Sequence, residues 1–173
     1  FTELKEYYKQ TSESDTTKIS FYEDTYSLYN LYRFAHYYEE AYGKYIWLKS
    51  GASLVIEHTE AMTVIDVNTG SVLKKKKQED TLFYQINREA AKEIARQLRL
   101  RNISGIIMID FINMKDTAQK EKLLSLLDSE CKKARVHCNV IDMTALNLVE
   151  MTRSKVRKPL HEQIRSCMKN NRS

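Results

Sequence analysis

The stretch Met62-Thr63-Val64-Ile65-Asp66-Val67-Asn68-Thr69-Gly70 decides the fold of this 173-residue chain. Its β-branched and apolar residues predict a short strand that ends at an aspartate, an asparagine and a glycine. A second stretch, Gly105-Ile106-Ile107-Met108-Ile109-Asp110-Phe111, repeats this plan of an apolar run closed by one carboxylate. Because aspartate is rare in strands and costly to bury, we expect the two carboxylates to meet at one edge of a sheet, where they can hold a divalent cation.

A helical pattern over residues 80–100 separates these two strands. At 100° per residue its apolar side chains fall on one face, and they are Leu82, Phe83, Ile86, Ala90, Ile94 and Leu98. A strand, a helix and a second strand within this length are typical of a crossover between parallel neighbouring strands. Sites form beyond the carboxyl ends of parallel strands, and both aspartates lie there.

Shorter patterns predict the rest of the sheet. The predicted strands cover residues 44–49, 53–57, 62–67, 105–111, 137–142 and 147–151. Short turns join the first three strands, which predicts an antiparallel meander. A further helix is predicted to begin at Asp116 or Thr117 and to run to about Ala134. The sequence therefore predicts an α/β fold with a mixed sheet flanked by helices.

The N-terminal part of the chain is rich in tyrosine. Eight of the eleven tyrosines lie within residues 21–45. From Tyr26 to Tyr42 they recur at helical spacing, which favours packing in a core or a subunit contact. Stacking platforms for nucleic-acid bases are the functional alternative. Residues 19–22 are predicted to form a strand before this helix, with Asp24 as its cap.

The composition excludes several classes of protein. Apolar residues make up 42% and charged residues 29%, which fits a globular domain with one core, and no apolar run approaches the roughly 18 residues of a membrane span. The three cysteines show no paired close spacing, which indicates a reducing, cytoplasmic location. The net charge of +5 favours a polyanionic partner. Because the chain begins at Phe1, we expect a piece excised from a longer protein.

Two cationic segments are candidate contacts for phosphate groups. Lys74 and Lys76 belong to a run of four lysines directly after the first acidic strand; such a loop is either merely solvated or binds phosphates. Arg153, Lys155 and Arg157 alternate at period two, which predicts that they share one face of an extended segment suited to a phosphate backbone. Basic ends of chains also occur as soluble tails without a partner.

Three further residues have competing interpretations. Asp142 is a third acid at the end of a predicted strand, and it ranks below the other two as a metal ligand because no asparagine or glycine accompanies it. His58 is interpreted as a solvated turn residue, since no second histidine lies at zinc-ligand spacing. Cys131 lies on the apolar face of its predicted helix and is interpreted as a core residue.

Together these motifs resemble the catalytic domain of the ribonuclease E/G family of endoribonucleases. The resemblance covers residues 19–166 and keeps the family's order and spacing. It is carried by Trp47–Gly51, Thr59–Gly70, Ala95–Arg101, Ile109–Met114 and Glu150–Arg153. It implies a ribonuclease H-like part over residues 1–50 and a deoxyribonuclease I-like catalytic part over residues 51–166. Residues 167–173 would then be a disordered tail or the remnant of a zinc-link segment.

The resemblance also implies an activity and a site. In the family's pattern Asp66 and Asp110 bind a catalytic Mg²⁺, with Mn²⁺ as an alternative, and Asn68 positions the scissile region. The implied reaction is hydrolysis of single-stranded, A/U-rich RNA to a 5′-phosphate and a 3′-hydroxyl, in RNA processing and decay. A homodimer or higher homo-oligomer is the implied assembly. The alternative is a catalytically weak RNA-binding or assembly module that keeps the fold.

Three features depart from the family's pattern. Asn113 stands where the family often has a second acid, which lowers the negative charge of the site. Cys167 stands near the first cysteine of the family's Cys-x-x-Cys zinc link, but Asn170 occupies the place of the second, so the resemblance does not carry the zinc link over. The family's oligonucleotide-binding domain and 5′-end sensor lie upstream of the region that this chain resembles.

Overall fold

The computed structural model describes residues 1–11, 19–70 and 79–170. The chain divides into two compact units, Phe1–Tyr37 and Tyr38–Ser173. This division precedes the first strand of the sheet, whereas the sequence places a boundary near residue 50. The earlier division follows from the pairing of that first strand with its neighbour in the second unit. The ribonuclease H-like and deoxyribonuclease I-like parts stay a prediction.

The first unit holds helices α1 (Thr2–Thr11) and α2 (Leu28–Leu31) and the start of α3 (Phe34–Tyr42). The single helix predicted from Tyr26 to Tyr42 is wrong, because Arg33 adopts a left-handed φ of 52° and separates α2 from α3. The strand predicted at residues 19–22 is also wrong, since these residues are irregular. Ser27, rather than Asp24, caps α2 through a bond from the Tyr29 amide to its hydroxyl.

The tyrosines of this region do not form a core. Six of them keep about half or more of their side-chain surface exposed, and they are Tyr26, Tyr29, Tyr32, Tyr37, Tyr38 and Tyr42. Ala41 is the buried residue of α3, and α2 has none. The helical spacing therefore predicted that helices form here, but it did not predict that their tyrosines stay exposed.

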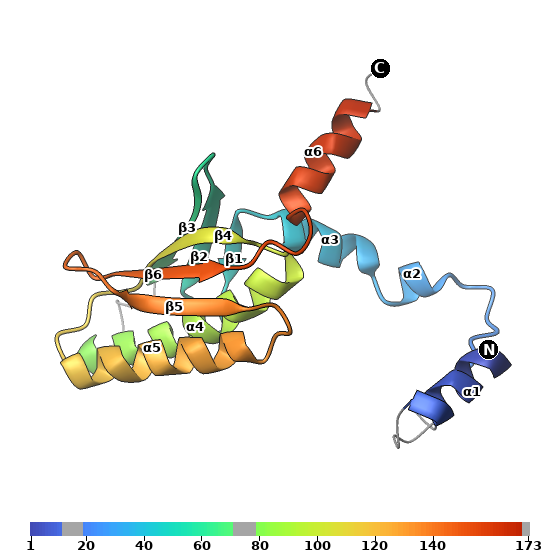
Figure 1. Ribbon diagram of the computed structural model, residues 1–173, viewed down its shortest axis with the longest axis horizontal. Helices are drawn as coiled ribbons and strands as arrows, with labels where there is room; N and C mark the ends of the chain where they lie inside the picture. Colours follow the sequence, from blue (N-terminus) through green and yellow to red (C-terminus); the bar gives the residue numbers. More distant parts are fainter. Residues whose placement is uncertain (12–18, 71–78, 171–173) are drawn as a thin grey trace. The chain divides into compact units, whose positions relative to one another are not determined.

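The second unit contains a six-stranded mixed sheet, as the sequence predicts (Figure 1). Its strands are β1 (Tyr45–Trp47), β2 (Ser53–His58), β3 (Met62–Asn68), β4 (Gly105–Asp110), β5 (Cys138–Met143) and β6 (Leu148–Arg153). They lie in the order β1-β2-β3-β4-β6-β5. The first three strands form the predicted antiparallel meander, and β3 pairs with β4 in parallel. All other neighbours are antiparallel.

Besides the end of α3, the described helices of this unit are α4 (Glu79–Leu100), α5 (Thr117–Lys132) and α6 (Leu160–Asn170). Helix α4 is the crossover between β3 and β4, and α4 and α5 pack against one face of the sheet (Figure 1). Helix α6 continues through Asn170, and the assignment of residues 167–173 as a disordered tail or the remnant of a zinc-link segment stays a prediction. Among the described residues, no helix combines the length and apolarity that a membrane span requires.

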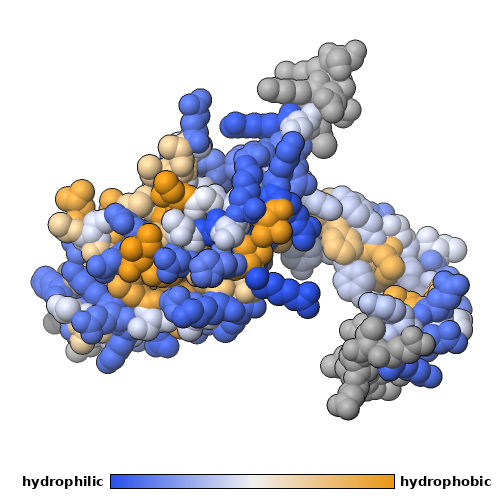
Figure 2. All heavy atoms as spheres, viewed as in Figure 1, coloured by the Kyte–Doolittle hydropathy of each residue, from blue (hydrophilic) through white to orange (hydrophobic). Residues whose placement is uncertain are grey.

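One core joins the sheet to these helices. In β3 and β4 every second residue is buried, and these residues are Thr63, Ile65, Val67, Ile107 and Ile109. Apart from the polar Thr63, they belong to the same cluster as the buried residues of the helices, including Ile86, Ile94, Leu98, Leu123 and Leu127. The residues between them point to the opposite face of the sheet. Apolar residues also reach the surface of this unit (Figure 2), among them Ile106, Ile141 and Leu146.

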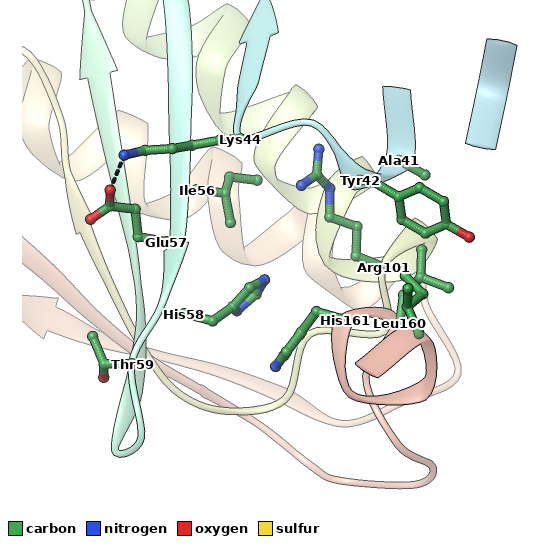
Figure 3. A pocket seen from close by; sticks show the side chains of 11 residues that line it. Ala41, Tyr42, Lys44, Ile56, Glu57, His58, Thr59, Arg101, Leu160 and His161 are labelled. Atoms are coloured by element: carbon green, nitrogen blue, oxygen red, sulfur yellow. Dashed lines mark ion pairs between the residues drawn. The ribbon is translucent and has the colours of Figure 1, made fainter. Parts of the chain in front are cut away.

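The first turn of α6 lies against the end of β2 (Figure 3). The rings of His58 and His161 stack, with centroids 3.8 Å apart and planes 15° from parallel. Thr63 Oγ1 lies 3.0 Å from Nδ1 of His58. Together with Arg101 and neighbouring residues, the two histidines line a cavity of about 520 Å³. His58 is therefore half-buried, and its interpretation as a solvated turn residue is wrong.

The buried position of His58 makes stability depend on pH. Burial first, and then the charges of His161 and Arg101, lower the pKa of His58 from its ordinary 6.5 to about 4. Between these values the unfolded chain binds the proton more readily than the folded protein. The contribution of His58 to the free energy of unfolding should therefore be at its maximum above pH 6.5 and should decrease as the pH drops towards 4.

Replacing His58 by phenylalanine, which keeps a flat ring beside His161, should flatten this fall in stability. The measurement is the melting temperature of wild type and His58→Phe at pH values from 7 to 4. His137→Gln is the control, because His137 is exposed and should leave the slope as in wild type. If the melting temperature of His58→Phe fell with pH as steeply as that of wild type, the assignment of this pH dependence to His58 would be wrong.

Candidate active site

Asp66 and Asp110 face each other across the two central strands. They form the last parallel pair of β3 and β4, in the register that begins with Met62 opposite Ile106. Residues directly opposite in neighbouring strands lie about 5 Å apart and project to the same side. Since Ile65 and Ile109 point into the core, both aspartates point to the other face of the sheet. The structure thus brings together the two acids that the sequence singled out.

The two carboxylates affect each other. The pKa of Asp110 is raised above its ordinary value, first by partial burial and then by the negative charge of Asp66. Within the part of the chain that the structure describes, neither carboxylate forms an ion pair. Two acids are therefore held side by side without a compensating cation from the described residues. This arrangement favours a group that brings positive charge.

Asn68 completes the cluster. Its amide Nδ2 donates to Oδ2 of Asp66 over 2.6 Å, which fixes the orientation of that carboxylate. The amide of an asparagine carries a further N–H and a carbonyl oxygen. Asn68 stands two residues after Asp66 in β3, so it projects to the same face of the sheet. The asparagine that the sequence placed in the site therefore touches its first acid.

The donor set of this cluster fits Mg²⁺. Mg²⁺ prefers oxygen ligands and is commonly held by one or two carboxylates while it keeps several waters. The described residues contain no group of three or more histidine, cysteine, aspartate or glutamate side chains that can hold a metal. Asp66 and Asp110, with the amide of Asn68 beside them, therefore fit a hydrated divalent ion better than a closed zinc site.

Asp142 does not join the pair. It lies on β5, and β6 separates β5 from β4. Its register partner is Glu150, and its Oδ1 accepts a bond of 2.7 Å from the amide of Met143. The strand order therefore keeps the third strand-end acid of the sequence away from Asp110. Strand order depends on long-range pairing, which the pattern of a single strand does not contain.

The three alternating cations near the C-terminus do not share an exposed face. Strand β6 continues to Arg153, which projects into the core side with Val149 and Met151 and is only 6% exposed. Its guanidinium donates to the carbonyl of Ile103 over 2.7 Å and to Asn102 Oδ1 over 3.3 Å. The expected common face with Lys155 and Arg157 is therefore wrong.

The other candidate phosphate contacts differ in their surroundings. Lys155 and Arg157 are exposed, and Lys155 Nζ lies 3.3 Å from a carboxylate oxygen of Glu162. Lys74 and Lys76 lie outside the described residues. Among the candidates that the structure describes, Lys155 and Arg157 thus remain available at the surface.

Sequence reasoning missed a residue that supports the site. Asn87 is fully buried in α4, and its side chain makes two bonds with the backbone of Ile112: Nδ2 donates to the carbonyl over 2.7 Å, and Oδ1 accepts from the amide over 3.0 Å. Ile112 follows Asp110 by two residues, so Asn87 holds the segment that leaves the site. In the sequence, Asn87 could have been recognised as a single amide residue that lies one helical turn after Phe83 on the apolar face of the predicted helix.

Gly70 shapes the turn after Asn68. Its φ is +58°, and a Cβ atom there would lie 2.7 Å from the carbonyl oxygen of Gly51. Both the left-handed conformation and this close approach require a residue without a side chain. The Gly51 turn and the end of β3 therefore pack tightly together.

Comparison with known proteins finds similar chains. A family model described as Ribonuclease E/G family matches residues 1–156. Ribonuclease G of Haemophilus influenzae is 39% identical over 160 residues, which cover 92% of this chain and 32% of that protein. Ribonuclease G of Escherichia coli is 40% identical over 145 residues, covering 84% and 29% respectively. Ribonuclease E of a Nostoc species is 35% identical over 162 residues, covering 92% and 23%. The chain spans about a third or less of the length of these relatives.

Replacing Arg153 by methionine should lower stability, because the buried carbonyl of Ile103 loses its donor. An unpaired buried polar group costs about 1–3 kcal/mol. Unfolding in urea measures this change. Arg157→Met is the matched control, since Arg157 is exposed and a surface substitution should change the free energy of unfolding by less than about 0.5 kcal/mol. Unchanged stability of Arg153→Met together with weakened RNA binding would restore the interpretation as a phosphate contact.

Proposed function

Because the chain belongs to the ribonuclease E/G family, we propose that it carries the catalytic centre of an endoribonuclease. The proposed substrate is single-stranded RNA, and the reaction is hydrolysis of an internal phosphodiester to a 5′-phosphate and a 3′-hydroxyl. The observation that carries this proposal is the opposed pair Asp66 and Asp110 at the ends of two parallel central strands. Ligand sites in open α/β sheets lie beyond such strand ends.

In this proposal Asp66 and Asp110 hold Mg²⁺, and Mn²⁺ is the alternative because it accepts the same oxygen ligands. When bound, the ion supplies polarisation of a phosphodiester oxygen and a more acidic water as the source of the nucleophile. The raised pKa of Asp110 supports this assignment, since a nearby cation removes the repulsion that disfavours its charged form.

The remaining residues of the site orient its parts. Asn68 holds the Asp66 carboxylate by its hydrogen bond, and the rest of its amide is suited to bind the phosphate or ribose near the scissile bond. Asn87 acts as a positioning residue through the backbone of Ile112. The site lies on regular strands and is held by a rigid helix, which suits the precise placement of reacting groups.

Further parts of the proposal rest on the family alone. They are a preference for A/U-rich RNA, a role in RNA processing and decay, a cytoplasmic location and a homodimer or higher homo-oligomer. Lys74, Lys76, Lys155 and Arg157 are proposed to contact phosphate groups, which would make binding weaken as salt increases. Without a second cysteine after Cys167, a zinc link between protomers is not part of the proposal.

Asp66→Asn and Asp110→Asn should each lower the cleavage rate by about 100-fold or more. A bound metal ion stabilises the charge of the transition state by about several kcal/mol, and each 1.36 kcal/mol changes a rate about tenfold. The melting temperature without metal should stay the same or rise, because one of two repelling charges is removed. The assay follows an end-labelled, A/U-rich single-stranded RNA with Mg²⁺ or with a chelator.

Asp142→Asn is the matched control, since Asp142 is a strand-end aspartate outside the pair. It should cleave as wild type does. Wild-type cleavage by Asp66→Asn or by Asp110→Asn would show that the site assignment is wrong. Salt-sensitive RNA binding without cleavage by the wild-type chain would favour the catalytically weak RNA-binding module instead.

A further inference from the structure

The edge strand β1 exposes two aromatic side chains side by side. Tyr45 is 60% exposed and Trp47 is 73% exposed, while Ile46 between them is 3% exposed and belongs to the core. This alternation places both rings on the face of the sheet opposite to α4 and α5. Burying Ile46 fixes their direction, because a strand cannot turn one residue inward without turning its neighbours outward.

The strand register places these rings in line with the acidic pair. Tyr45 is opposite Val55, Val55 is opposite Asp66, and Asp66 is opposite Asp110. The next row on this face runs from Trp47 through Ser53 to Asn68. Neighbouring strands lie about 4.8 Å apart, so the backbone of Tyr45 is about 10 Å from that of Asp66 and about 14 Å from that of Asp110.

We propose that Tyr45 and Trp47 form a stacking platform for bases of the single-stranded RNA a few nucleotides away from the scissile phosphate. Bases stack on exposed aromatic side chains with little dependence on sequence. A strand in a stacked helix advances about 3.4 Å per nucleotide, so the platform lies about three to four nucleotides from the acidic pair. The inference rests on the proposed function, because it assigns a binding subsite to the same active site.

The charges around the platform suit an RNA backbone. Lys44 Nζ lies 5.8 Å from the centre of the Tyr45 ring and pairs with Glu57, and Lys49 is exposed two residues after Trp47. Cations beside aromatic rings are the usual composition of sites for single-stranded nucleic acid. The exposed Lys49 therefore adds attraction for phosphates beside the rings, whereas the charge of Lys44 is already compensated by Glu57.

The acidic pair in the same row argues against a protein partner on this face. A protein that covered the aromatic edge and continued along the row would remove Asp66 and Asp110 from water without a cation, which is costly. A single RNA strand can stack at the edge of the sheet without covering the acids, and a metal ion can compensate its charge where it crosses them. An RNA strand therefore fits both the aromatic end and the acidic end of this row better than a protein partner does.

Trp47 is the one tryptophan of the chain, so its fluorescence reports directly on this position. The experiment titrates the 173-residue chain with a short A/U-rich RNA in the presence of a chelator, which prevents cleavage. Stacking of a base on the indole should quench its emission. An abasic oligomer of equal length and charge is the ligand control, and it should bind more weakly and cause little quenching.

Substitutions separate stacking from other roles of the same side chains. Trp47→Ala should raise the Kd for RNA by about 5- to 100-fold and leave the Kd for the abasic oligomer nearly unchanged. Trp47→Phe should retain affinity within about threefold, since a phenyl ring also stacks. Tyr45→Leu should weaken binding in the same direction. Tyr38→Ala is the matched control, because Tyr38 is half exposed on α3, outside both rows of the sheet.

The outcomes distinguish the platform from the proposed function. Equal RNA affinity and equal cleavage for wild type and Trp47→Ala would overturn the platform, while loss of cleavage in Asp110→Asn would still support the nuclease. A raised Kd for RNA in Trp47→Ala, measured by the anisotropy of end-labelled RNA, with an unchanged Kd for the abasic oligomer would support the platform even if Asp110→Asn cleaved like wild type. A change in oligomeric state of Trp47→Ala without a change in RNA affinity would overturn the platform in favour of a second copy of the chain.

Discussion

The parallel pairing of β3 with β4 sets the geometry of the acidic pair. It places Asp66 opposite Asp110, and the buried residues Ile65 and Ile109 hold that register from the other face of the sheet. A slip of one residue in either strand would turn its aspartate towards the helices and its isoleucine towards water. The hydrophobic core therefore sets the geometry of the acidic pair, although no core residue touches a substrate.

Helix α4 connects both sides of the site to this core. It is the crossover that makes β3 and β4 parallel, and its buried Asn87 holds the backbone after Asp110. On the same helix, the Glu89 carboxylate accepts bonds from the amides of Lys49 and Ser50, at 2.7 Å and 3.2 Å. These amides belong to the turn that follows β1. One helix thus fixes the segment behind the acids and the turn behind the aromatic edge.

Several arginines of this basic chain serve the fold. Arg153 donates to the carbonyl of Ile103, and Arg101 donates to the carbonyls of Gly43 and Glu40. Arg96 pairs with Glu93 and Glu40. Burial lowers the pKa of Arg101 and Arg153, but a guanidinium remains charged and its donors must be satisfied. The net charge of +5 therefore overstates the cationic surface that is free to attract RNA.

Patterns in the sequence predicted the local features of the sheet: the two apolar strands that close with Asp66 and Asp110, the helix between them, and from these the parallel crossover. Period-two and period-3.6 patterns report which side of an element is buried, and those patterns lie within a single segment. The pairing of distant segments determines the burial of His58 and Arg153, the separation of Asp142 from the pair, and the alignment of Tyr45 and Trp47 with the acids. Each of these depends on strand order, register or a partner distant in the chain. Periodicity within one segment carries no information about which other segment packs against it.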